Sequence, residues 1–194
     1  MNEITLFLLV ILITYSYSYL SNKRFIYKSR NIKLYLGSET ETGGSYPSTL
    51  VYPDDVSLGK AVCHDLLSIV SSSITEKGKA FVAVPGGSVL KMLSGLKSNK
   101  NDIDWNKVYW FYVNHKCVSS DDETSTNNKA LKYFMKELYK ESNLANNVVS
   151  IDIDDAAVGH DTIAHKYEKR IKELLPALNK LPIFDYMLLG ISIT

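Results

Sequence analysis

A buried strand that leads into a glycine turn and then into a helix constrains this chain more than any other stretch. Lys79 and the apolar residues 80–84 run into Pro85-Gly86-Gly87-Ser88, and apolar residues at helical spacing follow. Glycine lets a backbone approach a ligand closely, and a helix start presents unpaired N–H groups at the positive end of its dipole. Ser88 could either cap this helix or donate its hydroxyl to a phosphate oxygen. The turn therefore predicts an anion site, although a Gly-Gly turn that serves packing alone would have the same sequence.

Strands and helices alternate along the rest of the chain. Apolar runs predict further strands over 108–113, 148–151 and 184–189. Apolar residues at helical spacing predict helices over 58–70, 88–96, 127–140 and 163–175. This alternation indicates a Rossmann-like α/β fold, with a parallel sheet flanked by helices on both faces. Ligands of such sheets bind at the carboxyl ends of the strands, so the loops after Val84, Val113 and Leu189 should converge on one site.

Each of these three loops carries a motif. The strand over 108–113 leads to Asn114-His115-Lys116 and a downstream Ser125-Thr126, and Phe184-Asp185 opens the run that ends at Leu189-Gly190. In this order and spacing, residues 55–190 resemble the 6-phosphogluconolactonase family, within the group that includes the glucosamine-6-phosphate isomerases. That family shows Ser-Gly-Gly-Ser/Thr, then Asp-Glu-Arg-x-Val-Pro with Ser-Asn or Ser-Thr, and finally Phe-Asp-x-x-x-Leu-Gly-x-Gly-x-Asp-Gly-His.

The resemblance implies an activity and a set of site residues. The activity is hydrolysis of 6-phospho-D-glucono-1,5-lactone to 6-phosphogluconate in the pentose phosphate pathway, by a carboxylic ester hydrolase that needs no metal or cofactor. Its partner would be a small-molecule sugar phosphate. The residues implied to bind the substrate phosphate are Gly86, Gly87, Ser88 and Lys116. Those implied to form the substrate-site loop are Asn114, His115, Ser125 and Thr126.

Two departures from the family motif narrow the chemistry. Asn114 stands where the sugar-phosphate isomerase-deaminases need a carboxylate to abstract a proton, and an amide cannot accept one at neutral pH. This argues against the deaminase branch. Lys116 replaces an arginine, which keeps a cation for the phosphate but not the bidentate fork.

The identity of the general base stays open in the sequence. In the family it is the histidine of the Asp-Gly-His loop, which would begin after Gly190, whereas this sequence ends at Thr194. We therefore expect a domain that is incomplete at its C-terminus, in which residues 184–189 form an unpaired edge strand that makes residues 55–194 alone poorly soluble. His115 is a weak candidate for the base, and the competing interpretation is a loop histidine bonded to Asp121 or Asp122. The alternative function is a non-catalytic sugar-phosphate-binding remnant or an inactive truncated gene product.

The first 38 residues have the composition of a targeting leader. Residues 6–13 form an apolar run that suits the h-region of a secretory signal and is too short to span a bilayer. Between residues 4 and 38 there are five basic residues and no acidic one, which is typical of an organelle transit peptide. Together they predict delivery to a plastid through the secretory route. The alternatives are a plain secretory signal, a membrane anchor extended through residues 15–20, or a cytoplasmic protein.

The chain therefore divides into a leader (1–38), a linker (39–54) and one α/β domain (55–194). After the leader, 17 basic and 20 acidic residues make the body mildly acidic, which does not favour nucleic-acid binding. We expect no stable membrane insertion once the leader is removed. Cys63 and Cys117 are too few for a disulfide framework and are expected to be reduced thiols.

Overall fold

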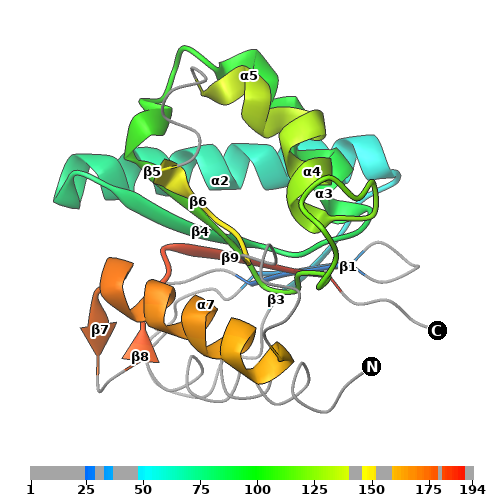
Figure 1. Cartoon of the computed structure of the whole chain (residues 1–194). Helices are drawn as coiled ribbons and strands as arrows, with labels where there is room; N and C mark the ends of the chain where they lie inside the picture. The colour runs from blue at the N-terminus through cyan, green and yellow to red at the C-terminus, as the bar shows by residue number, and fades with distance from the viewer. Residues whose placement is uncertain are drawn as a thin grey trace.

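A parallel five-stranded sheet with the strand order β1-β9-β4-β5-β6 lies at the centre of the structure (Figure 1). Its strands span Phe25–Lys28 (β1), Tyr186–Gly190 (β9), Ala80–Val84 (β4), Val108–Tyr112 (β5) and Val148–Val149 (β6). The computed structural model describes residues 25–28, 33–36, 48–139, 146–151, 159–178 and 181–190. The predicted α/β class with a parallel sheet is confirmed.

Helices cover both faces of this sheet (Figure 1). The helical segments on one face are α2 (Asp55–Lys77), α3 (Val89–Met92), η1 (Leu93–Asn99), α4 (Thr126–Ala130), η3 (Leu131–Met135) and α5 (Lys136–Leu138). On the other face lies α7 (His160–Leu174), followed by the short hairpin of β7 (Ala177–Leu178) and β8 (Leu181–Pro182). A single helical turn, η2 (Trp105–Lys107), precedes β5.

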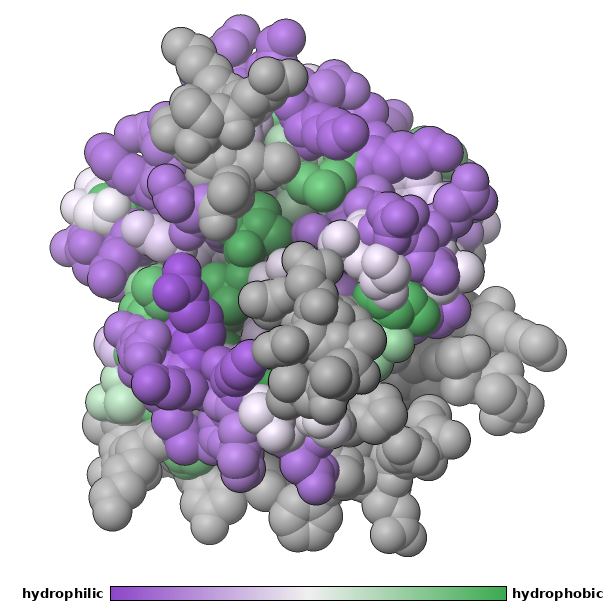
Figure 2. All heavy atoms as spheres, viewed as in Figure 1, coloured by the Kyte–Doolittle hydropathy of each residue, from purple (hydrophilic) through white to green (hydrophobic). Residues whose placement is uncertain are grey.

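Strand residues alternate between two hydrophobic cores. In β4, Val82 and Val84 pack under α2, whereas Phe81 and Ala83 pack against the α7 side. A parallel strand that is covered on both faces needs a continuously apolar sequence. All five residues of β4 are apolar and buried. Figure 2 shows hydrophobic side chains gathered between α7 and the helices of the opposite face, at the sheet edge that β6 forms.

Capping residues decide where α2 begins and ends. Asp54 accepts a hydrogen bond from the backbone N–H of Ser57 at 2.7 Å, which satisfies one of the free donors at the helix start. Gly78 ends the helix in the left-handed conformation, with φ at 79°. These two caps make α2 23 residues long, which is longer than the four turns expected from its apolar spacing alone.

Strand β9 is not an edge strand, which corrects the sequence prediction. It pairs with β4 on one side, at Tyr186 and Met187, and with β1 on the other, from Met187 to Gly190. The error has a physical cause: apolar periodicity reports that a strand is buried but not which strand lies beside it. The partner that covers β9 comes from a segment interpreted as part of the leader.

Three strands fall within the stretches interpreted as leader and linker. Besides β1, these are β2 (Lys33–Leu36) and β3 (Ser48–Val51), which pair antiparallel with each other. The apolar run over residues 6–13 lies outside the described residues, and the leader and linker assignments stay predictions. In the part of the chain that the structure describes, no helix is both long enough and apolar enough to cross a membrane.

Candidate functional site

The loop after β4 and the loop after β5 meet at the carboxyl edge of the sheet. The backbone N–H of Gly86 donates a hydrogen bond of 2.5 Å to the side-chain oxygen of Asn114. Just before these loops, the N–H of Val113 donates to the carbonyl of Val84 at 2.9 Å. The glycine turn and the Asn114 loop therefore lie against each other, as the sequence predicted for strands that end at one margin.

The other two motif segments also reach this edge. A methyl group added at Gly86 would lie 3.3 Å from the hydroxyl of Thr126, at the start of α4. One added at Gly190, at the end of β9, would lie 3.0 Å from a methyl of Val89 and 3.7 Å from the ring of Pro85. The loops after β4 and β5 and the end of β9 thus come together, and Gly86 and Gly190 allow this close approach because neither has a side chain.

Gly87 is needed for its backbone conformation rather than for space. Its φ of 79° lies in the left-handed region, while a methyl group added there would meet no described atom within 4 Å. Residues with a Cβ adopt this conformation at a cost of about 1–2 kcal/mol. The turn consequently presents open backbone on its outer side.

Ser88 does not cap the helix that follows it. It precedes α3 with helical backbone angles, and its side chain makes no capping hydrogen bond. The sequence left two roles open for this hydroxyl, helix capping and phosphate binding, and in the structure it does not cap the helix. Binding of a phosphate oxygen by Ser88 remains a prediction.

His115 is held by its own loop rather than by a carboxylate. Its Nδ1 donates to the carbonyl of Lys116 at 2.8 Å, and its ring meets Tyr112 edge to face with centroids 5.0 Å apart. The interpretation that His115 bonds to Asp121 or Asp122 is wrong. Those carboxylates instead accept hydrogen bonds from the Ser119 hydroxyl and the Thr124 N–H respectively.

The protonation state of His115 follows from this setting. Burial lowers the pKa of the ring, more than the bond to the Lys116 carbonyl raises it. A neutral ring that donates from Nδ1 leaves Nε2 as an acceptor. Nε2 is buried, and within the described residues it has no hydrogen-bond partner. It would have to be uncovered before it could take a proton from water, so the role of His115 as a general base stays a prediction.

Lys116 supplies an exposed cation beside these loops. Hydrogen bonds from Thr124 lower the pKa of the neighbouring Asp122 most, and the charges of Lys116 and Lys129 lower it further. An exposed ammonium on the loop that is hydrogen-bonded to the glycine turn suits a phosphate monoester.

Ser125 and Thr126 form the start of α4. Ser125 is buried, and its hydroxyl accepts the N–H of Asn128 at 3.4 Å, which makes it the N-cap of this helix. Thr126 is buried against Gly86. Their contact with a substrate stays a prediction.

Sequence analysis missed the residues that anchor the end of β5. The hydroxyl of Tyr112 donates to the side-chain oxygen of Asn127 at 2.7 Å. Tyr167, on α7, hydrogen-bonds to both backbone groups of Tyr112. Tyr167 lies on the apolar side of its helix, packed against the core. The missed signal was its hydroxyl, because a buried tyrosine hydroxyl usually needs a partner.

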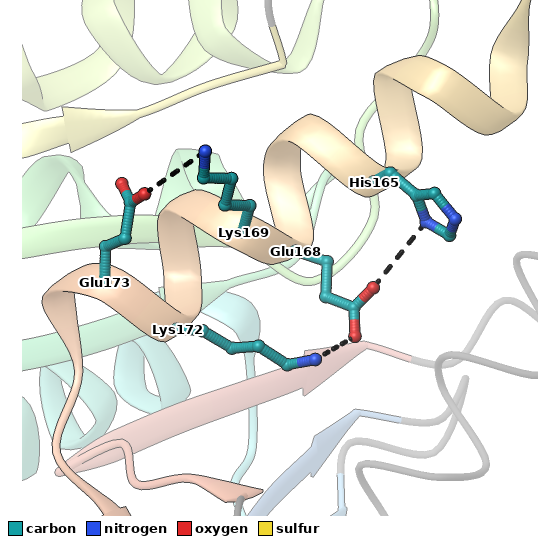
Figure 3. A pocket seen from close by; sticks show the side chains of 5 residues that line it. All are labelled: His165, Glu168, Lys169, Lys172 and Glu173. Carbon is teal, nitrogen blue, oxygen red and sulfur yellow. Dashed lines mark hydrogen bonds and ion pairs between the residues drawn. The ribbon is translucent and has the colours of Figure 1, made fainter.

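A buried carboxylate and a charged surface hollow lie away from this edge. Asp185 is buried near the amino end of β4, where it accepts the N–H of Phe81 at 2.8 Å and pairs with Lys77. An open hollow beside α7 is lined by the side chains of His165, Glu168, Lys169, Lys172 and Glu173 (Figure 3).

The charges along α7 form a solvated surface. The side chains lining the hollow are 46–83% exposed, and they pair with one another along the helix (Figure 3). Pairs of this kind satisfy charge locally and add little stability. Over the described residues, no group of three or more His, Cys, Asp or Glu could hold a metal ion. Cys63 is buried, Cys117 is exposed, and both are free thiols, as expected.

Comparison with known proteins identifies the family. Residues 53–191 match the family model described as glucosamine-6-phosphate isomerases/6-phosphogluconolactonase. The chain belongs to this family. It is similar to 6-phosphogluconolactonase of Mycobacterium tuberculosis, with 24% identity over 143 residues, covering 73% of this chain and 58% of the relative. A probable 6-phosphogluconolactonase 4 of Arabidopsis thaliana is 28% identical over 153 residues, covering 74% and 58%.

Solved structures share the family fold. The 6-phosphogluconolactonase from Trypanosoma cruzi superposes with a TM-score of 0.61 at 24% identity, over 74% of this chain and 58% of that one. The enzyme from Leishmania guyanensis gives a TM-score of 0.62 at 22% identity, over 74% and 59%. The chain thus spans somewhat more than half the length of the relatives it matches.

Proposed function

We propose that this chain binds the phosphate of 6-phospho-D-glucono-1,5-lactone and belongs to an enzyme that hydrolyses this lactone to 6-phosphogluconate. One observation carries the proposal: the glycine turn after β4 is hydrogen-bonded to the loop that holds Lys116. A glycine turn with open backbone, an exposed serine hydroxyl and an exposed cation at one sheet edge together suit a phosphate monoester. The names of the relatives support the lactone as the substrate.

In this proposal each loop has a separate task. Gly86, Gly87 and Ser88 surround the phosphate, and Lys116 neutralises its charge. Asn114 holds the turn in place through the N–H of Gly86 and takes no part in proton transfer. Hydrolysis further needs an activated water and donors for the oxyanion that forms on the lactone carbonyl.

A non-catalytic sugar-phosphate binder is the second candidate. The enclosed Nε2 of His115 favours it, because the described residues then offer no uncovered histidine at this edge to activate water. Release of acid from 6-phosphogluconolactone, compared with its spontaneous hydrolysis, separates the two functions. A rate above the spontaneous one establishes the hydrolase, whereas binding without such a rate establishes the binder.

Substitution of Lys116 tests the phosphate site itself. We expect 6-phosphogluconate to bind the wild-type chain, and Lys116→Ala to weaken binding by about 10- to 100-fold, since a hydrogen bond to a charged group contributes about 1.5–3 kcal/mol. Isothermal titration calorimetry measures both. Lys116→Arg keeps the charge and should retain most of the affinity, and Lys129→Ala is the control for a nearby lysine. Equal affinities for wild type and Lys116→Ala would rule out this phosphate site.

We also propose that residues 1–38 direct the protein into the secretory route and from there to a plastid. The apolar run over 6–13 and the acid-free basic stretch that follows support this proposal. A fluorescent protein fused behind residue 38 should accumulate in the organelle, and the same fusion without residues 6–13 should stay in the cytoplasm. Cytoplasmic fluorescence from the complete leader would contradict the proposal.

A further inference from the structure

The outer edge of β5 loses its strand partner just before the candidate site. On one side, β4 accompanies β5 through Tyr112. On the other side, within the described residues, β6 pairs with Trp110 and Phe111 but not with Tyr112. The backbone N–H and C=O of Tyr112 therefore extend past the end of β6. Such buried backbone groups need another partner, because leaving them unpaired costs as much as a lost hydrogen bond.

The hydroxyl of Tyr167 takes the place of that missing strand. It accepts the N–H of Tyr112 at 2.9 Å and donates to the C=O of the same residue at 3.0 Å. A single hydroxyl can do both because it carries one donor and two acceptor positions. Burial raises the pKa of Tyr167, so the hydroxyl keeps its proton at working pH.

Tyr112 passes this restraint on to the site. Its ring packs against His115, and its hydroxyl bonds to Asn127 in α4. Two residues further along the chain, Asn114 accepts the N–H of Gly86. Tyr167 on α7 thus holds the last residue of β5, from which the loop with Asn114, His115 and Lys116 begins.

We infer that Tyr167 is a positioning residue, whose hydroxyl fixes the end of β5 and thereby sets how the loop of residues 114–116 lies against the glycine turn. The inference rests on the proposed function, since the ligand positioned by that loop is the sugar phosphate. The positioning itself can be measured without any ligand.

The chain supplies a matched control at the other end of the same strand. The hydroxyl of Tyr139 donates to the C=O of Val108 and accepts the indole N–H of Trp110, both at 2.7 Å. Tyr139→Phe and Tyr167→Phe therefore each remove one buried hydroxyl and two hydrogen bonds from β5. Only Tyr167 adjoins the candidate site.

Amide hydrogen exchange of the full chain, followed by NMR, tests the positioning. Tyr167→Phe should speed exchange of the Gly86 and Val113 amides by about tenfold, the factor expected for the loss of one to two hydrogen bonds. Tyr139→Phe should leave the exchange rates of these two amides within about twofold of wild type, once the change in its free energy of unfolding is taken into account. Equal effects of the two variants, no effect of Tyr167→Phe, or failure of Tyr167→Phe alone to fold would overturn the inference.

Binding of 6-phosphogluconate by calorimetry completes the test. Tyr167→Phe should weaken binding by about fivefold or more, and Tyr139→Phe by no more than about twofold. Unchanged affinity of Tyr167→Phe despite faster exchange would overturn the inference. If the wild-type chain binds no 6-phosphogluconate, the proposed function fails, while the exchange rates still decide whether Tyr167 holds the loop.

Discussion

Asp185→Ala should lower the free energy of unfolding by about 1.5–3 kcal/mol, the contribution of a hydrogen bond to a charged group. Asp185 is 8% exposed and accepts the backbone N–H of Phe81, while its other oxygen pairs with Lys77. Its own N–H donates to the Phe81 carbonyl at 2.9 Å, so this residue joins the start of β9 to the start of β4. Without the carboxylate, the Phe81 N–H loses its partner in a buried setting.

Urea unfolding followed by circular dichroism measures this loss. Asp185→Asn should cost less than Asp185→Ala, because an amide oxygen can still accept the Phe81 N–H. Glu173→Ala removes one half of an exposed pair, whose side chains are 80% and 53% exposed, and should change stability by less than about 0.5 kcal/mol. A loss below about 1 kcal/mol for Asp185→Ala would show that the contact at the start of β4 contributes little.

A chain that starts at residue 39 should aggregate, because it lacks β1 and leaves one edge of β9 unpaired. In the full chain β1 covers that edge from Met187 to Gly190. An unpaired strand edge is a template for pairing with another chain. The apolar sequence of β9 makes this edge attractive to a second copy. We expect most of the shortened protein to elute as large species in size-exclusion chromatography.

A chain that starts at residue 22 is the matched control, because it keeps both β1 and β2. It should elute as one defined species, as should the full chain. Monodisperse behaviour of the shorter chain would show that β1 is dispensable. The comparison also bears on the proposed leader, since cleavage before Phe25 leaves β1 in place whereas cleavage after residue 38 removes it.

The local elements of the domain could be predicted from the sequence alone. The strand over 80–84, the glycine turn and the helix after it are all present in the structure, as are the strand that starts at Val108 and the charged helix α7. The physical reason is that burial and backbone freedom are local properties. A strand covered on both faces must be apolar throughout, and a left-handed turn such as that at Gly87 favours glycine.

Only the tertiary structure decided which groups meet. The sequence places Asn114 and Gly86 28 residues apart and Tyr167 and Tyr112 55 residues apart, yet both pairs are hydrogen-bonded. Strand order is equally non-local, which is why β9 was mistaken for an edge. Periodicity encodes how deeply a residue is buried, whereas hydrogen bonds between distant segments depend on the topology of the whole sheet. The sequence therefore indicated which loops meet at the candidate site, but not which partner holds each of its residues.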